Sequence, residues 1–468
     1  MPINNLHRFI SLLESNGELS RISVHVDPLL EIAAITNRVC KQPGGGKALL
    51  FEHPSGSIFP VATNLFGSLQ RVCRALGIDQ LNDLTDKMSA LLNQISEPEL
   101  GSLDRQIREL PDFSRFTPRI SGNPEPNLIT MDPPDLTLFP FLQSWPEDGS
   151  ADRHLRYITL PQVFTVDPAG GSPNCGIYRT QVRGPLELAI QWKTGSGAAR
   201  HAEEFRRRGG AMPVAIALGG DPAATFSAMF PLPGTLDEMT FAGFLRGRSI
   251  EMAACRTVPL SVPATAELVI EGYINPTEKV MEGPFGNHTG FYSPASSAPL
   301  LRVTAIYHRE GAIIPATLVG PPPMEDCWMA KAWERLLLAF LQRLVPTVIE
   351  IHFPLEWIFH QSAIISLDNP TPGMVRETAD VLWSTPWFGA ARLLVFIDAE
   401  TDGADLSGVA WQSINMSEFK HDIFFDTSGK RLALDATGCC FTQKRIRGDA
   451  DVAVRVARRW QEYGLTEP

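Results

Sequence analysis

Residues 212–218 read MPVAIAL and residues 261–273 read SVPATAELVIEGY, and both are apolar runs with glycine or proline near their ends. Further short runs of the same kind lie at residues 157–160, 177–182 and 301–307. Short strands at this spacing, separated by glycine turns, predict a β-barrel or sandwich between residues 156 and 309. Two predicted helices, at residues 198–208 and 236–246, interrupt the strands.

The sequence on either side of this β-rich region has the alternating pattern of α/β domains. Near the N-terminus, a predicted helix at residues 7–16 precedes a strand at residues 18–26. Beyond three consecutive prolines at residues 321–323, a long helix is predicted at residues 324–344 and a buried strand at residues 392–398. Both ends of the chain are therefore expected to be α/β units.

Local signals predict three further helices. Asp27-Pro28 resembles an N-cap followed by proline at the first helical position, which predicts a helix at residues 29–39. Residues 87–110 are predicted to be one helix that is polar on one side. The tail at residues 450–463 is amphipathic, and we expect this helix to pack against a second subunit.

Proline content and chain length predict how these parts are divided. Eight prolines between residues 111 and 146 exclude helix there and predict a long connecting segment. A chain of 468 residues is too long for one ordinary core. The fold class is therefore multidomain α+β, with an N-terminal α/β domain at residues 1–115, a central β domain at residues 116–315 and a C-terminal α/β domain at residues 316–468.

Composition excludes several functional classes. A formal net charge of −11 argues against a nucleic-acid or anionic-membrane partner. The N-terminus has no secretory pattern, and no apolar run approaches the roughly 20 residues that span a bilayer. The 7 cysteines are scattered and do not predict a disulfide framework. We expect a cytoplasmic protein with no membrane span.

Two oxygen-bearing residues are candidate metal ligands: Asn174, which opens the stretch NCGIYR at residues 174–179, and Glu238. No cysteine or histidine cluster has zinc spacing, and oxygen ligands favour Mg²⁺ or Mn²⁺ shared with a phosphate. Each residue also has a simpler interpretation, Asn174 in a turn and Glu238 in the first turn of a helix.

A glycine-rich turn, GSGAAR at residues 195–200, could present backbone N–H groups at a helix N-terminus to a phosphate. Arg200 stands where a dinucleotide fingerprint has its third glycine, so that motif is absent. An ordinary strand-to-helix turn is an equal alternative.

Arg179 and Glu282 are the candidate catalytic pair. The planar guanidinium of Arg179 matches a substrate carboxylate with two hydrogen bonds. Glu282, in the turn EGPFG, could orient that arginine or move a proton. The alternatives are a surface salt bridge for Arg179 and a solvent-exposed turn acid for Glu282.

In this order, the motifs resemble those of the UbiD family, whose members are decarboxylases that use prenylated FMN. The resemblance extends over nearly the whole chain. The matching stretches are FISLLESNGEL at residues 9–19, SWPEDG at 144–149, YITLPQV at 157–163, NCGIYR at 174–179, ALGGDP at 217–222, FAGFLRG at 241–247, EGPFG at 282–286 and LDAT at 434–437.

The resemblance implies a central split β-barrel like that of flavin reductases and a C-terminal domain that forms a homodimer or a larger homo-oligomer. It implies reversible non-oxidative decarboxylation of an aromatic or α,β-unsaturated acid. The cofactor would come from a separate flavin prenyltransferase.

The resemblance also assigns residues. Asn174 and Glu238 would bind Mn²⁺ or Mg²⁺, which holds the cofactor phosphate, with K⁺ or Na⁺ nearby. Arg179 and Glu282 would be two of three catalytic residues. The residues expected to contact the cofactor are Ile177, Tyr178, Arg179, Gln191, Trp192, Lys193, Ser196, Gly197 and Lys430.

Two positions depart from the family pattern. Asn287 stands where the family usually has Asp or Glu as the proton donor, and an amide cannot donate in that way. His288 or His360 could replace it, although His288 could also be a structural histidine of the turn. Gln191 stands where relatives carry His or Arg, so the metal shell or the phosphate contact is altered, and we count Gln191 among the candidate metal ligands.

The second half of the chain hints at the substrate. Residues 290–294 (GFYSP), 318–326 (LVGPPPMED) and 359–360 (FH) resemble the menaquinone-pathway branch, whose members decarboxylate 1,4-dihydroxy-6-naphthoate. Residues 353–358 are bulkier than that branch suggests. The alternatives are another aromatic, heteroaromatic or α,β-unsaturated acid, and, outside the decarboxylases, an FMN reductase or a non-catalytic flavin-binding subunit.

Overall fold

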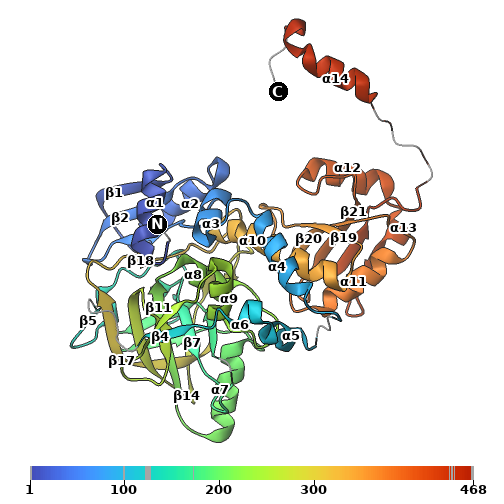
Figure 1. Ribbon diagram of the computed structural model, residues 1–468. Helices are drawn as coiled ribbons and strands as arrows, with labels where there is room; N and C mark the ends of the chain where they lie inside the picture. Colours follow the sequence, from blue (N-terminus) through green and yellow to red (C-terminus); the bar gives the residue numbers. More distant parts are fainter. Residues whose placement is uncertain are drawn as a thin grey trace.

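The computed structural model describes residues 3–97, 101–121, 128–171, 173–441, 443, 446 and 448–464. Figure 1 shows an N-terminal α/β unit beside a large central sheet, and a second α/β unit to one side of both. A last helix, α14 (Ala450–Arg458), lies away from these three parts.

The N-terminal unit is built on a four-stranded sheet in the order β1-β2-β3-β18. Its last strand, β18, follows the strands of the central sheet in the chain and pairs with β3. Backbone hydrogen bonds therefore tie the segment after the central sheet to the N-terminal unit. The elements are α1 (Leu6–Ser15), β1 (Leu19–Val26), α2 (Glu31–Cys40), η1 (Pro43–Gly45), β2 (Ala48–Pro54), β3 (Val61–Thr63), α3 (Leu69–Leu76), α4 (Asn82–Leu92) and β18 (Ile314–Pro315).

Three expectations for this half of the chain were wrong. Helix α2 begins at Glu31, because the N–H of Leu30 donates to the carbonyl of Gln143 instead of continuing a helix from Pro28. The segment predicted as one helix is two, α4 and α5 (Leu103–Glu109). A short helix, α6 (Pro111–Ser114), opens the proline-rich segment, since proline is tolerated at the first helical position.

The central sheet has nine strands in the order β6-β9-β10-β17-β14-β11-β7-β8, with β5 paired to β17. Its longest strands, β14 (Ala266–Glu282) and β17 (Ser296–Arg309), pair along most of their length. The remaining strands are β5 (Leu128–Thr130), β6 (Tyr157–Ile158), β7 (Gln162–Thr165), β8 (Asn174–Ile177), β9 (Thr180–Gly184), β10 (Glu187–Ile190) and β11 (Met212–Gly219).

Within the described residues, the edge strands β6 and β8 of this sheet do not pair with each other, so the sheet is open. Its likeness to the split barrel of flavin reductases stays a prediction. Helices and smaller ladders surround it: η2 (Leu136–Leu138), α7 (Gly197–Arg208), α8 (Pro222–Met229), α9 (Glu238–Arg246), the sheet of β4 (Arg119–Ser121), β12 (Glu251–Ala254) and β13 (Ser261–Pro263), and the hairpin of β15 (Phe285–Gly286) and β16 (Tyr292–Ser293).

The C-terminal unit has a five-stranded sheet in the order β19-β20-β21-β23-β22. Its strands are β19 (Val348–His352), β20 (Ser362–Leu367), β21 (Leu393–Asp398), β22 (Ile423–Phe425) and β23 (Leu432–Asp435). Its helices are α10 (Glu325–Leu344), α11 (Met374–Ser384), α12 (Leu406–Met416) and α13 (Phe419–Asp422), followed by α14 and η3 (Trp460–Tyr463).

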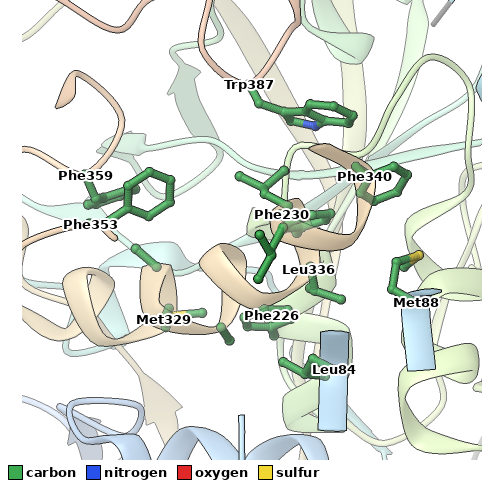
Figure 2. Close-up of a cluster of buried hydrophobic side chains, with 14 of the residues drawn as sticks. Leu84, Met88, Phe226, Phe230, Met329, Leu336, Phe340, Phe353, Phe359 and Trp387 are labelled. Atoms are coloured by element: carbon green, nitrogen blue, oxygen red, sulfur yellow. The ribbon is translucent and has the colours of Figure 1, made fainter. Parts of the chain in front are cut away.

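Helix α10 joins the three parts through one hydrophobic core, drawn in Figure 2. Its residues Leu336 and Phe340 lie in the same cluster as Phe226 of α8 and Leu84 of α4. Trp387 of the C-terminal unit also packs here, and its indole N–H donates to the carbonyl of Pro231 at 2.8 Å. The core therefore fixes the C-terminal unit against the central sheet. In the part of the chain that the structure covers, no helix is both long and apolar enough to cross a bilayer.

Candidate functional site

Arg179 and Glu282 form a two-point ion pair at one end of the central sheet. Arg179 lies between β8 and β9, and Glu282 is the last residue of β14. The Nε and Nη2 atoms of Arg179 donate to the two carboxylate oxygens of Glu282 at 2.8 Å and 2.7 Å. The Glu282 side chain is fully buried and that of Arg179 is 18% exposed, so the exposed-residue alternatives do not hold.

Aromatic rings surround this pair. The guanidinium of Arg179 lies 4.8 Å from the centre of the Phe285 ring, and Phe285 packs against Tyr157 at 4.8 Å. Burial, followed by the charge of Glu282, raises the pKa of Tyr157 well above its usual value. The site is therefore poorly solvated, which strengthens charge interactions inside it.

The loop SWPEDG supports the turn that follows Glu282. Asp148 accepts hydrogen bonds from the backbone N–H groups of Gly286 at 2.8 Å and Trp145 at 2.9 Å. Burial raises the pKa of Asp148 to about 6 despite these bonds. A Cβ at Gly286 would overlap the Trp145 ring, so only glycine allows this approach.

Glu238 is a partly buried carboxylate near Asn174. It is the first residue of α9, and its Oε2 accepts the backbone N–H of Cys175 at 2.9 Å, which places it beside Asn174. Among the described residues no Lys or Arg forms an ion pair with it. Burial raises the pKa of Glu238 to about 8. A bound cation would relieve this cost.

Asn174 meets the N-terminus of helix α7. The Oγ of Ser196 caps that helix by accepting the N–H of Ala199 at 3.3 Å. A Cβ at Gly197 would overlap the side-chain oxygen of Asn174, so glycine is required for this approach. The Tyr178 hydroxyl faces Asn174 and Ser196, and burial raises the pKa of Tyr178.

These residues fit a divalent cation that carries a phosphate. No group of three or more His, Cys, Asp or Glu side chains in the described ranges could hold a metal alone. One amide oxygen and one carboxylate beside a helix N-terminus leave coordination positions for phosphate oxygens, as Mn²⁺ and Mg²⁺ prefer.

Gln191, Trp192 and Lys193 follow strand β10. The N–H of Gln191 donates to the carbonyl of Arg179 at 3.1 Å, and its Nε2 donates to Ser296 at 3.3 Å. No hydrogen bond in the described part of the chain joins Gln191 to Asn174 or Glu238, so its role as a metal ligand stays a prediction. The Trp192 ring meets Tyr178 edge-on at 6.2 Å.

Ile177 and Lys430 are the two remaining residues of the predicted cofactor set, and they lie on different parts of the fold. Ile177 is the half-buried last residue of β8, beside Tyr178. Lys430 lies in the turn between β22 and β23, where its N–H donates to Asp426 at 3.0 Å. Within the described residues, no hydrogen bond or ion pair connects Lys430 to the central sheet.

Asn287 and His288 lie beyond the turn that follows Glu282. Asn287 Nδ2 donates to Ser293 Oγ at 2.9 Å, and its Oδ1 lies 3.0 Å from His288 Nδ1. His288 Nε2 lies 2.6 Å from Asp326 Oδ2, at the start of α10. Burial is the largest effect on Asp326 and opposes its ionisation, but the interactions with His288 and the hydrogen bonds from Cys327 together outweigh it and lower the pKa of Asp326.

His360 completes this cluster. Its ring centre lies 5.1 Å from that of His288 and 5.1 Å from that of Phe359. Burial, then the positive charges of His288 and Lys193, lower the pKa of His360 to about 4. His360 is therefore neutral at pH 7.

Sequence reasoning missed roles for Asp326, Asp148 and Tyr157. Asp148 and Tyr157 lie inside stretches that carried the family resemblance, so those stretches held the signal. Asp326 ends the stretch LVGPPPMED, but it is 38 residues from His288 in the chain, and nothing in that stretch marked it as a partner of the histidine.

The chain matches profiles of 3-octaprenyl-4-hydroxybenzoate carboxy-lyases in all three parts. The N-terminal domain matches residues 10–91, the Rift-related domain residues 120–322 and the C-terminal domain residues 327–443. An uncharacterized protein of Aquifex aeolicus (strain VF5) is 38% identical over 99% of this chain and 93% of its own length. One of Archaeoglobus fulgidus is 37% identical over 88% of this chain and 84% of its own.

Solved structures agree with this assignment. An evolved dimeric form of the UbiD-class enzyme HmfF from Pelotomaculum thermopropionicum, in complex with prFMN, has a TM-score of 0.81 at 26% identity and covers 97% of this chain and 99% of its own. The closed form of vanillic acid decarboxylase from Sedimentibacter hydroxybenzoicus has a TM-score of 0.83 at 23% identity over 99% of both chains, which shows the shared fold. The protein therefore belongs to the UbiD family of carboxy-lyases and is an enzyme of that class.

Proposed function

We propose that this enzyme catalyses the reversible non-oxidative decarboxylation of an aromatic acid, using prenylated FMN and Mn²⁺. The observation that carries the proposal is the buried Arg179–Glu282 pair, with both hydrogen bonds formed. Glu282 occupies the Nε and Nη2 donors, so the Nη1–Nη2 edge of the guanidinium is available for a substrate carboxylate.

The residues that would hold the cofactor lie beside this pair. Asn174 and Glu238 would bind the divalent metal and through it the phosphate, with K⁺ or Na⁺ nearby. Ser196 and Gly197 would present the N-terminus of α7 to the same phosphate, and Tyr178 would line the flavin. The bound cofactor supplies an electron sink, which the loss of CO₂ from an aromatic ring requires.

The protein's own residues then orient the acid and manage the proton. Arg179 holds the carboxylate, and Glu282 fixes the plane of Arg179. When the carbon–carbon bond breaks, CO₂ leaves without the bonding electron pair, and the ring carbon takes up one proton in its place. The reverse reaction requires a base at the same place. Because Phe285, Tyr157 and Glu282 are buried, the charges act at a low local dielectric.

For the substrate we propose a hydroxylated polycyclic acid of the naphthoate kind. Flat rings suit the aromatic side chains around the site, Trp145, Tyr157 and Phe285 among them. The menaquinone-like stretch at residues 318–326 contributes to this wall, since the Trp145 indole N–H donates to the carbonyl of Val319 at 2.7 Å. Another aromatic, heteroaromatic or α,β-unsaturated acid is the alternative.

We also propose that the C-terminal domain forms a homodimer. Helix α14 buries none of its residues, and Val454 on it is 52% exposed. Large apolar side chains are also exposed on α12, α13 and β22, namely Ile414, Phe419 and Phe425. Light scattering on the whole chain and on a chain ending at Gly448 would test this by giving the number of subunits in each particle. The same number of subunits in both would contradict a role for α14 in the dimer.

One experiment tests the proposed function. The protein is co-expressed with a flavin prenyltransferase, the released ligand is weighed by mass spectrometry, and CO₂ release is measured from naphthoates, benzoates and heteroaromatic acids. Prenylated FMN together with CO₂ release from an aromatic acid supports the proposal. Unmodified FMN with NAD(P)H oxidation would favour a reductase. Bound cofactor without turnover of any acid would favour a non-catalytic subunit, the reading that Asn287 supports.

A further inference from the structure

Under the proposed function Asn174 is a metal ligand, and the inference that follows rests on that assignment. The side-chain amide of Asn174 has two ends, an oxygen that binds hard cations and an NH₂ group that only donates hydrogen bonds. A metal site built on this residue therefore needs a feature that fixes which end of the amide faces the cation.

Thr165 lies directly opposite Asn174 in the central sheet. Strands β7 and β8 are antiparallel, and their register pairs Thr165 with Asn174. Side chains at paired positions point to the same face of a sheet, so these two meet there. Asn174 Nδ2 donates a long hydrogen bond to Thr165 Oγ1, at 3.4 Å. The amide oxygen is thereby left on the side of Gly197, where an added Cβ would overlap it.

His201 contacts the Thr165 hydroxyl from helix α7, the helix whose N-terminus lies beside Asn174. It is four residues after Gly197, and its Nδ1 lies 2.9 Å from Thr165 Oγ1. Thr165 is fully buried and His201 is 7% exposed, so the hydroxyl proton needs an acceptor within the protein. Asn174 Nδ2 cannot accept it, so among the described residues this acceptor is His201 Nδ1. Burial lowers the pKa of His201, and the neutral ring has the lone pair that this bond requires.

These three side chains allow one arrangement of protons. Thr165 donates to His201 and accepts from Asn174. An Asn174 amide turned over would set its oxygen against the Thr165 oxygen with no proton between them. It would also point its NH₂ group at the N-terminus of α7, where the helix dipole is positive. Both effects favour the orientation in which the amide oxygen faces the N-terminus of α7.

We propose that Thr165 and His201 are positioning residues for the divalent cation, which together hold the Asn174 amide with its oxygen toward the metal. Neither side chain is itself a ligand in this proposal. Thr165 accepts the hydrogen bond of the NH₂ group, and His201 accepts the hydroxyl proton that Thr165 could otherwise donate to a turned amide. Removing a partner of this kind from behind a metal ligand typically weakens metal binding about 10–100-fold.

The first test measures Mn²⁺ binding by the whole chain in the presence of saturating FMN, from the electron paramagnetic resonance signal of free Mn²⁺. Thr165→Val keeps the shape of the side chain but loses the hydroxyl, and should weaken binding about 10–100-fold. Thr165→Ser keeps the hydroxyl and should bind nearly as tightly as the wild type. Thr36→Val is the matched control: it removes another buried hydroxyl, which lies 2.9 Å from that of Thr63 in the N-terminal unit, and should leave Mn²⁺ binding unchanged.

Thermal unfolding without metal shows whether both valine variants are folded. Wild-type affinity in folded Thr165→Val would overturn the positioning role alone. Equal weakening in Thr36→Val would also overturn it, because any lost buried hydroxyl would then have the same effect. A wild type that binds no Mn²⁺ would remove the metal from the proposed function, and this proposal with it.

The second test asks whether the two residues act through one amide. His201→Leu removes the acceptor of the Thr165 proton and should also weaken Mn²⁺ binding. The double variant His201→Leu with Thr165→Val should bind no more weakly than Thr165→Val alone, because both changes release the same side chain. Additive losses, or wild-type affinity in folded His201→Leu, would overturn the proposal.

Discussion

Two glutamates of the candidate site, Glu282 and Glu238, have different surroundings: Glu282 is fully buried, and Glu238 is partly buried. Glu282 has both carboxylate oxygens bonded to Arg179. Among the described residues, Glu238 accepts one backbone N–H and forms no ion pair with Lys or Arg, and burial raises its pKa to about 8. Under the proposed function, the substrate end would be complete in the protein alone, whereas the phosphate end would be completed by a metal ion.

The largest effect is expected from Glu282→Gln, which would break the substrate end. The amide keeps the shape of Glu282 but loses its charge and its ability to move a proton. Turnover should fall by at least about 10²–10⁴-fold. Cofactor content, measured by absorbance of the released flavin, should stay at the wild-type level. Substantial remaining turnover would contradict the role given to Glu282.

Arg179→Met would test whether the same pair is also structural. It leaves a fully buried carboxylate without its partner, which typically costs about 3–5 kcal/mol in the free energy of unfolding. Denaturant unfolding of the cofactor-free protein measures this cost. The double variant Arg179→Met with Glu282→Met removes the orphaned charge and should recover most of the stability. If Arg179→Met alone were as stable as the wild type, the Arg179–Glu282 pair would not contribute to stability.

Glu238→Gln would test the second glutamate of the comparison, through the effect of its charge on stability. The folded-state pKa of Glu238, about 8, is above its ordinary value of 4.5, so the folded protein holds more protons between these pH values. Its free energy of unfolding therefore falls as pH rises from about 4.5 to about 8. Thermal unfolding is measured at pH 5 and pH 8.5, without metal. The loss of stability between the two pH values should be smaller in Glu238→Gln than in wild type.

The same variant should lose its response to Mn²⁺. Metal binding requires the charged carboxylate, so in the wild type it should release a proton and tighten as pH rises toward 8. Calorimetry in buffers of different ionisation enthalpy measures that release. Equal proton release by Glu238→Gln would remove Glu238 from the metal site.

The smallest effect is expected from Gly197→Ala, which would crowd Asn174 without changing any charge. Overpacking of this kind costs about 1–3 kcal/mol in the free energy of unfolding. We expect weaker binding of FMN with Mn²⁺, measured by fluorescence titration, and a normal fold. Gly101→Ala is the control, because a Cβ there meets nothing within 4 Å. Equal affinities of Gly197→Ala and Gly101→Ala for FMN would mean that cofactor binding does not require the close contact between Gly197 and Asn174.

Much of the fold was predictable from local signals. The predicted helix at residues 324–344 begins one residue before α10 and ends with it, and that at 236–246 begins two residues before α9. Helix α2 starts later than predicted because a distant carbonyl, that of Gln143, captures the N–H of Leu30. Such a contact between remote segments leaves no trace in the local pattern.

In the candidate site, too, some residue pairs were predictable from the sequence and others were not. Arg179 and Glu282 were predicted together because a forked donor and a carboxylate are chemically complementary, although 103 residues separate them. The pairing of His288 with Asp326 was not predicted, because it depends on where α10 begins relative to the central sheet. Chemistry identified candidate residues, and only tertiary packing could select their partners.

Helix α10 has a consequence for how the enzyme unfolds. Its apolar side chains belong to one cluster that also contains residues of the N-terminal unit and of the helices beside the central sheet. The three parts should therefore melt as a single cooperative unit instead of one after another. A ligand bound at either end of the site would then raise the melting temperature of the whole chain.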